Sequence, residues 1–135
     1  ALGGVLNEKT IPRLQCRAVC GAANNQLAEA IDDDALAERG ILYAPDFVVN
    51  AGGIINLAEE FVGYDRDNAR ERTAQIANTV RRVFEIARAE RVPPGRAAEQ
   101  LARRRIAEEG AGRRFRPGDP TAWTNGAPLR TLRPA

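Results

Sequence analysis

The stretch VVNAGGIIN, residues 48–56, constrains the fold of this chain more than any other part of its sequence. Two β-branched residues, which favour a strand, run into an asparagine and two glycines, and an apolar stretch with helical character follows. Glycines at such a junction leave the backbone bare, so that another group can approach it closely. The stretch therefore predicts a strand, a loop that a ligand can approach, and a helix in direct succession.

The segments before this loop predict an α/β fold with parallel strands, because strands and helices alternate along the chain. The predicted elements are a short helix in EKTIPRL (8–14), an apolar strand in CRAVCGAA (16–23), helical stretches in NNQLAEAI (24–31) and DDDALAERG (32–40), and an extended ILYAPDFVVNA (41–51). This layout is that of the second half of a Rossmann-like doubly wound sheet, with the first half missing.

Helices fill most of the chain after the loop. The pattern predicts helices over residues 53–63, 67–91 and 94–109, and a pair of prolines ends the second and opens the third. The second helix carries a stripe on one face, formed by Ala69, Thr73, Ile76, Val80, Val83 and Ala87. We expect three parts: the half of a nucleotide-binding domain at 1–62, a C-terminal helical segment at 63–109, and an irregular Arg/Pro/Gly-rich tail at 110–135.

Three loops are predicted to meet at the carboxyl edge of the sheet, where ligands of such folds bind. They are ALGG (1–4), GAANN (21–25) and NAGG (50–53). Small residues let a flat ring lie against the backbone, and asparagine amides suit a carboxamide or an amino-acid head group. For each loop by itself a tight turn is the favoured interpretation, in which glycine permits positive φ and asparagine caps a helix. Three such loops at one edge of the sheet make a ligand site an equal alternative.

Composition limits the chemistry available to the chain. It contains no histidine, so we expect no metal site of the zinc type. Cys16 and Cys20 would lie about 13 Å apart along a strand, at about 3.3 Å per residue. That separation exceeds the reach of a disulfide, about 7 Å between Cα atoms. The two cysteines are therefore predicted to be small buried apolar residues.

The location and completeness of the chain are expectations from its overall pattern. No apolar run approaches the roughly 18–20 residues of a membrane span, and no signal peptide opens the chain. We therefore expect no membrane partner and a cytoplasmic location. The 135 residues begin with Ala1 and include no methionine, so we expect them to be part of a longer polypeptide.

Charge is distributed unevenly along the chain. Residues 1–90 carry ten basic and fourteen acidic side chains, whereas residues 91–135 carry ten arginines and four acids. An arginine-rich end can bind phosphates. With few aromatic residues nearby and no nucleic-acid motif, a solvated helix face with a tail is the expected interpretation, and a nucleic-acid binder is the alternative.

Four segments together resemble the amino-acid dehydrogenase family that includes leucine, valine, phenylalanine and glutamate dehydrogenases. They are ALGGVLNEKTIPRL, GAANNQLAE, RGILYAPDFVVNAGGIIN and AEE, and the resemblance covers about residues 1–108. It implies NAD-dependent oxidative deamination of an L-amino acid to a 2-oxo acid, with release of ammonia and NADH. It also implies a missing N-terminal catalytic half and a homo-oligomer.

The resemblance assigns roles to particular residues of this sequence. It implies cofactor contacts for Ala1, Ala22, Ala23, Asn24 and Asn50, and substrate contacts for Asn24, Ile54 and Leu57. Two branched aliphatic residues favour a branched-chain or aromatic amino acid as the substrate. An apolar pocket separates such neighbours by only about 1–3 kcal/mol per methylene, so the preferred amino acid is left open.

Family features that are absent from the sequence are equally informative. No G-x-G-x-x-G motif occurs, and the only lysine, Lys9, lies in a polar segment that offers no perturbed base. Asp46 is predicted to be a cap or a surface residue. No catalytic residue is therefore assigned, and the chain alone is expected to be inactive. The alternative is a truncated, non-catalytic relative that acts as an oligomerisation or binding module through the 73–87 helix face.

Overall fold

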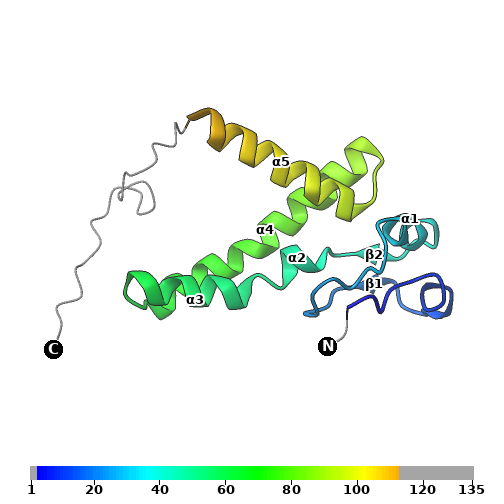
Figure 1. The fold of residues 1–135 in the computed structure, drawn as a ribbon, viewed down its shortest axis with the longest axis horizontal. Coiled ribbons are helices and arrows are strands. Elements are labelled where there is room, and N and C mark those ends of the chain that lie inside the picture. The colour runs from blue at the N-terminus through cyan, green and yellow to red at the C-terminus, as the bar shows by residue number, and fades with distance from the viewer. Residues whose placement is uncertain (1–2, 113–135) are drawn as a thin grey trace. The chain divides into compact units, whose positions relative to one another are not determined.

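The computed structural model describes residues 3–112, so Ala1 and most of the predicted tail, residues 113–135, lie outside the described residues. Two compact units divide the chain at residues 102 and 103. The first unit holds nearly all of the described elements (Figure 1). In order, these are η1 (Ile11–Arg13), β1 (Ala18–Val19), α1 (Ile31–Glu38), β2 (Leu42–Tyr43), α2 (Asp46–Val49), α3 (Gly52–Val62), α4 (Arg66–Glu90) and the first part of α5 (Pro94–Gly112).

The sheet of the first unit is parallel, as predicted, but short. β1 pairs with β2 through Ala18 opposite Leu42 and Val19 opposite Tyr43. A further isolated parallel bridge joins Leu6 to Leu27. The described chain is therefore an α/β arrangement in which helices predominate.

The prediction of an extended segment up to Ala51 is wrong beyond Tyr43. Pro45 precedes a helical turn, and its carbonyl accepts the N–H groups of Val48 (2.9 Å) and Val49 (3.1 Å). The β-branched residues thus contribute to α2, because local hydrogen bonds and tertiary contacts outweigh their strand propensity. The loop before α3 leaves a helical turn and not a strand.

The predicted helix over residues 24–31 is also absent, and α1 begins only at Ile31. Asn25 adopts a left-handed φ of 52°. The following backbone pairs with the segment around Leu6, because the Leu6 N–H donates to Gln26 (2.9 Å) and the Ala28 N–H donates to Leu6 (2.9 Å). Pairing with a neighbouring segment has satisfied the backbone groups that a helix would have used. The helix predicted over 32–40 is confirmed, with Gly40 at a φ of 67° after its end.

Two apolar clusters hold the first unit together. One lies between the short sheet, α1 and η1, and consists of Leu6, Ile11, Leu36, Ile41 and Tyr43. The other joins α4 to the start of α5, with Val83, Ile86, Ala97 and Ala98 buried and Val48 of α2 packed against them. The first cluster supports the loop region that follows β1, and the second supports α2.

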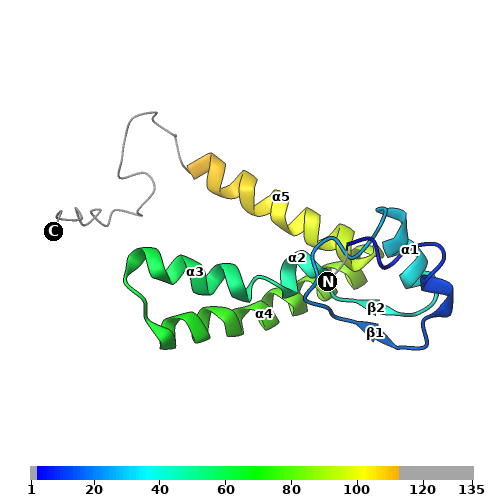
Figure 2. The ribbon, with the colours of Figure 1, turned by 60° about the horizontal axis from the view of Figure 1, so that its bottom comes forward.

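The helices after the loop are confirmed. α3 and α4 lie side by side in both views (Figures 1 and 2). Glu59 of α3 is buried and accepts a hydrogen bond from Asn68 of α4 (2.7 Å), and it also forms an ion pair with Arg72. Of the predicted stripe on α4, Ala69 and Val83 are buried, whereas Thr73 is exposed. α5 continues to Gly112, beyond its predicted end at residue 109.

The two cysteines are exposed free thiols, so the prediction that they are buried is wrong. β1 contains only two residues and pairs only with β2 among the described strands, so Cys16 and Cys20 flank the strand without cover on both faces.

None of the helices in the described part of the chain combines the length and the apolar character that a membrane span requires. The described part of the second unit, residues 103–112, continues α5 and exposes Ile106.

Candidate functional site

The three loops predicted to meet at one edge of the sheet are joined by hydrogen bonds. The Gly4 N–H donates to the Asn25 carbonyl (2.7 Å), and the Asn25 N–H donates to Oδ2 of Asp46 (2.7 Å). The side-chain amide of Asn50 donates to Oδ1 of Asn24 (2.5 Å). The loop at Asn24 and Asn25 therefore lies at the centre of this cluster, with one neighbouring loop on each side.

A cleft opens between the Asn24–Asn25 loop and the start of α3. Its volume is about 570 Å³, which is within the range of small-molecule sites. The residues that line it combine amides, one buried carboxylate and apolar groups: Asn24, Asn25, Asp46, Phe47, Asn50, Ala51 and Ile54. The cleft can therefore offer hydrogen bonds on one side and an apolar wall on the other.

The structure brings together three of the residues to which the resemblance assigned contacts. Asn24, Asn50 and Ile54 all line the cleft, and the Ile54 side chain is 70% exposed there. Leu57 lies one turn further along α3, is half-exposed, and is not part of the lining.

Ala22 and Ala23, in the same loop as Asn24, lie outside the lining of the cleft. Ala22 is exposed, and the Ala23 carbonyl accepts a hydrogen bond from the buried Gln26 side chain (2.9 Å). Neither alanine lines the cleft. Ala1 lies outside the described residues. The ligand contacts assigned to all of these residues stay predictions.

Asp46 is a buried residue, so the prediction that it is a cap or a surface group is wrong. Only 6% of it is exposed, and no side-chain cap bond is formed at the start of α2. Its Oδ1 accepts the Tyr43 hydroxyl (2.6 Å), while Oδ2 accepts the Asn25 N–H. The sequence does carry a signal for this: Tyr43 and Asp46 are three residues apart around a proline, and a short loop of that kind brings the two side chains together.

The Tyr43 hydroxyl stays protonated. Burial raises the pKa of Tyr43 well above its ordinary value of 10, and the hydrogen bond to the Asp46 carboxylate raises it further. The hydroxyl therefore remains a donor to Asp46 at neutral pH, and the pair lies beside the cleft.

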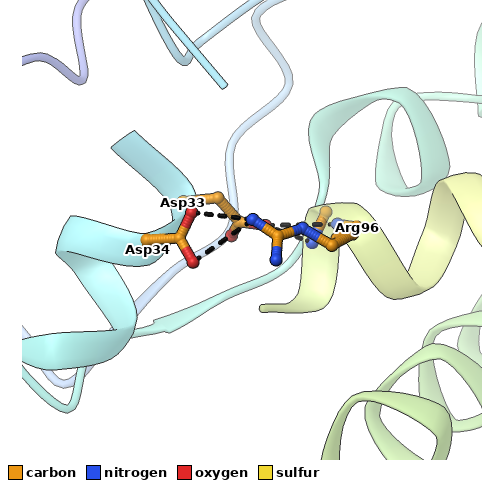
Figure 3. Close-up of polar contacts among 4 residues, drawn as sticks. Asp33, Asp34 and Arg96 are labelled. Atoms are coloured by element: carbon orange, nitrogen blue, oxygen red, sulfur yellow. Dashed lines mark hydrogen bonds and ion pairs between the residues drawn. The ribbon is translucent and has the colours of Figure 1, made fainter. Parts of the chain in front are cut away.

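A second buried carboxylate lies away from the cleft. Oδ2 of Asp33, in α1, accepts the backbone N–H groups of Gly95 (2.8 Å) and Arg96 (3.2 Å) at the start of α5 (Figure 3). Asp34 beside it forms an ion pair with the Arg96 guanidinium (3.0 Å). Burial raises the pKa of Asp33, against the lowering effect of the two backbone hydrogen bonds. The sequence pattern indicated only acids in the first turn of a helix.

The lining of the cleft supplies hydrogen-bonding amides and apolar groups for a ligand. No lysine, cysteine or histidine lines it, and both oxygens of Asp46 are already engaged. Among residues 3–112 no group of three or more carboxylate, histidine or cysteine side chains is arranged to hold a metal ion. The amides of Asn24 and Asn50 can donate to and accept from a planar amide or an amino-acid head group.

Comparison with known proteins identifies the family of the chain. The family model described as Glutamate/Leucine/Phenylalanine/Valine dehydrogenase matches residues 1–113. The valine dehydrogenase of Streptomyces albus is 50% identical over 113 residues, which are 84% of this chain and 31% of that protein. The leucine dehydrogenase of Thermoactinomyces intermedius is 47% identical over 106 residues, 78% of this chain and 29% of that protein.

A solved structure extends the likeness to the fold. The L-tryptophan dehydrogenase from Nostoc punctiforme superposes with a TM-score of 0.78 at 46% identity, covering 82% of this chain and 33% of that one. The chain thus spans about a third of the length of the relatives that it matches.

Proposed function

The chain belongs to the Glutamate/Leucine/Phenylalanine/Valine dehydrogenase family, and on that premise we propose that it is the coenzyme-side part of a longer amino-acid dehydrogenase. Its proposed reaction is the NAD-dependent oxidative deamination of a branched-chain or aromatic L-amino acid to a 2-oxo acid and ammonia. In this proposal the described α/β part is the second half of a Rossmann-like domain. The remaining part of the polypeptide supplies the catalytic lysines.

The observation that supports this function best is the amide pair at the mouth of the cleft. Asn24 and Asn50 come from two different loops, and their side chains are hydrogen-bonded to each other beside the apolar Ile54 side chain. An amide pair next to an aliphatic wall matches a ligand that has a polar head and an apolar side chain. No charged group in the lining offers a partner for a second carboxylate of the substrate, which favours apolar amino acids over glutamate.

The residues present fit one end of a nicotinamide coenzyme. The Asn24 and Asn50 amides have the donors and acceptors that a carboxamide requires, and both line the cleft. The pyrophosphate end has no counterpart here, because no G-x-G-x-x-G motif occurs in the 135 residues. The coenzyme, when bound, supplies the hydride acceptor. This chain would orient the ring and the substrate head and exclude water from them.

The direct test is activity of the protein expressed from its complete reading frame. We expect reduction of NAD with L-valine, L-leucine, L-isoleucine or L-phenylalanine, followed by the absorbance of the reduced coenzyme. Release of ammonia in equal amount would verify deamination. Absence of turnover with every amino acid of this panel would contradict the proposal.

A chimera tests the contribution of this chain separately. Residues 1–113 would replace the matching 50%-identical segment of the Streptomyces albus valine dehydrogenase. We expect the chimera to oxidise amino acids, because the missing catalytic half is then supplied by the relative. A chimera that folds, as judged by circular dichroism and oligomeric state, but is inactive would argue against a catalytic role for this segment.

Two α3 variants test the selectivity wall. Ile54→Ala should shift the preference toward larger amino acids, by about 1–3 kcal/mol for each methylene accommodated. Leu57→Ala is the matched comparison, since Leu57 does not line the cleft of the described structure. An equal shift in both variants would place the substrate side chain further along α3 than the cleft extends.

A non-catalytic module is the alternative function, and one observation favours it. Three large apolar side chains on α3 are exposed: Ile54 (70%), Leu57 (50%) and Phe61 (85%). They are spaced by three and four residues and so lie on one face of the helix. Sedimentation of the 135-residue chain would separate the two: a soluble, monodisperse oligomer favours the module, whereas aggregation that the remainder of a dehydrogenase relieves favours the enzyme. The homo-oligomeric state and the cytoplasmic location belong to the same proposal.

A further inference from the structure

We propose that Asp46 is a positioning residue that sets the Asn24 side chain at the mouth of the cleft by holding the backbone of Asn25. The inference rests on the proposed function, since it concerns how the cleft meets its ligand. Asp46 would act through one hydrogen bond to the neighbouring loop, since both of its carboxylate oxygens are already engaged by protein donors.

The first step of the argument is that one helical turn holds the Asn24–Asn25 loop at two points. Asp46 accepts the Asn25 N–H (2.7 Å), and the Asn50 amide donates to the Asn24 side chain (2.5 Å). The Asn50 N–H also donates to the Asp46 carbonyl (2.9 Å), so both contacts come from the same turn at α2. Backbone and side chain of the loop are thus fixed relative to a single rigid element.

The second step is that this loop requires holding. Asn25 has a φ of 52°, a left-handed conformation that is uncommon for non-glycine residues and in which asparagine is among the better tolerated. Its carbonyl accepts the Gly4 N–H (2.7 Å), so both backbone polar groups of Asn25 are used by other segments, the loop at Gly4 and helix α2. A Cβ on Gly3 would lie 3.2 Å from the same carbonyl, so the approach of that loop is also close. If the contact with Asp46 were lost, Asn25 would be free to return to a more common conformation with negative φ.

The third step is that Asp46 is itself buried and held by hydrogen bonds on both oxygens. The Tyr43 hydroxyl donates to its Oδ1 (2.6 Å), and the Asp46 N–H donates back to the Tyr43 oxygen (3.3 Å). Tyr43 belongs to the apolar cluster beneath the sheet and is 1% exposed. A continuous path of fixed groups therefore runs from the core through Tyr43 and Asp46 to the loop that carries Asn24.

Three variants of the protein from its complete reading frame test this role. Asp46→Ala should lower kcat/KM by about 100-fold, the effect of a misplacement of about 1 Å in a binding group. Asp46→Asn should recover most of the loss, because its amide oxygen can still accept the Asn25 N–H while its NH₂ donates to Tyr43. Asp33→Ala is the matched control: an equally buried aspartate, outside the cleft, that also accepts backbone N–H groups. It should leave kcat/KM unchanged.

A double-mutant cycle identifies the route of the effect. If Asp46 acts through Asn24, then Asp46→Ala should cost little further kcat/KM in an Asn24→Ala background. Two losses that multiply independently would overturn the proposal. So would an Asp46→Ala protein that loses only thermal stability and keeps the KM for coenzyme and amino acid.

A measurement without turnover separates this inference from the proposed function. In the protein from its complete reading frame, followed by residue-resolved hydrogen-exchange mass spectrometry, Asp46→Ala should accelerate hydrogen exchange of the Asn25 amide by about tenfold or more, since its acceptor is removed. The same amide should be little affected by Asp33→Ala. If the wild-type protein proves inactive, the function fails while the exchange result still decides whether Asp46 holds the loop. Unchanged exchange at Asn25 would overturn the inference whatever the activity.

Discussion

Two buried aspartates, Asp33 and Asp46, both accept backbone N–H groups, but they lie in two different regions of the molecule and the contacts have different consequences. Asp33 is 4% exposed and Asp46 is 6% exposed, and each accepts backbone N–H groups from a segment distant in sequence. Asp33 reaches Gly95, 62 residues away, and Asp46 reaches Asn25, 21 residues away. One contact fixes the start of a helix, and the other fixes a loop beside a cleft.

The difference lies in how completely each carboxylate is partnered. Both oxygens of Asp46 accept hydrogen bonds, one from a side chain and one from the backbone. For Asp33 both backbone bonds fall on Oδ2, and Oδ1 is buried without a partner among the described residues. Hydrogen bonds on both oxygens define the position of the Asp46 carboxylate. The Asp33 carboxylate also stabilises its contact with α5, but its unpartnered Oδ1 carries a desolvation cost.

The largest effect is expected from crowding the Asp33 contact. A Cβ on Gly95 would lie 2.6 Å from Oδ2 of Asp33, so Gly95→Ala must displace the start of α5. We expect a loss of about 3 kcal/mol in the free energy of unfolding, at the upper end for overpacking a buried site. Urea denaturation measures it. The matched control is Gly53→Ala, where a Cβ would meet nothing within 4 Å; comparable destabilisation there would contradict the steric explanation.

The next effect separates stability from function. Asp33→Ala removes the acceptor of two N–H groups at a helix start, for an expected loss of about 2 kcal/mol in the free energy of unfolding. Because Asp33 does not line the cleft, the KM for coenzyme should not change. Thermal unfolding and steady-state kinetics on the same preparation check both parts. A raised coenzyme KM in this variant would remove the distinction between the two aspartates.

A smaller effect concerns pH. Burial raises the folded-state pKa of Asp33 above its ordinary 3.8, so the folded protein binds the proton more tightly than the unfolded chain. The contribution of protonated Asp33 to the free energy of unfolding is therefore fully present below pH 3.8 and is lost as the pH rises through the folded-state pKa. We expect the stability of the wild type relative to Asp33→Asn to increase as the pH is lowered from neutral toward 4. A relative stability that increases with rising pH would show that Asp33 favours its charged form.

The smallest effect is expected at Asp34, next to Asp33. Its ion pair with Arg96 is partly exposed to solvent, so Asp34→Ala should cost no more than about 0.5–1 kcal/mol. The loss should shrink as salt is added, because exposed ion pairs are screened. Denaturation at low and high salt is the check. A cost equal to that of Asp33→Ala would mean that charge, and not the buried backbone contact, holds α1 to α5.

Much of the helical part could be predicted from the sequence. The long helix α4 has an apolar stripe with steps of three and four, and prolines at 93 and 94 mark its end, so its bounds differ little from those predicted. The parallel strand order was also predictable from the alternation of elements. Short segments were less predictable: Val48 and Val49 have strand propensity but lie in α2, and residues 24–30 follow a helical composition without forming a helix.

Part of the candidate site was likewise within reach of the sequence. Loops rich in asparagine and glycine after predicted strands were expected to meet, and Asn24, Asn50 and Ile54 do line one cleft. Asp46 was misjudged, because exposure of a carboxylate is the usual outcome. Its contact with Tyr43, three residues away, has a local signal, but its contact with Asn25, 21 residues away, has none. Asp33 was indistinguishable from its acidic neighbours, since its partner at Gly95 is 62 residues away.

The sequence by itself determined the long helices, the parallel α/β character and the family of this protein, because periodicity, prolines and loop motifs are local properties of the chain. Only the tertiary structure decided which aspartates are buried, where the β-branched residues of 48–49 fold, and which asparagine amides face each other. These outcomes depend on hydrogen bonds between segments that are far apart in sequence, such as the bond from Asn25 to Asp46. Once a backbone N–H is buried it must find an acceptor, and packing, not local propensity, determines which residue supplies it.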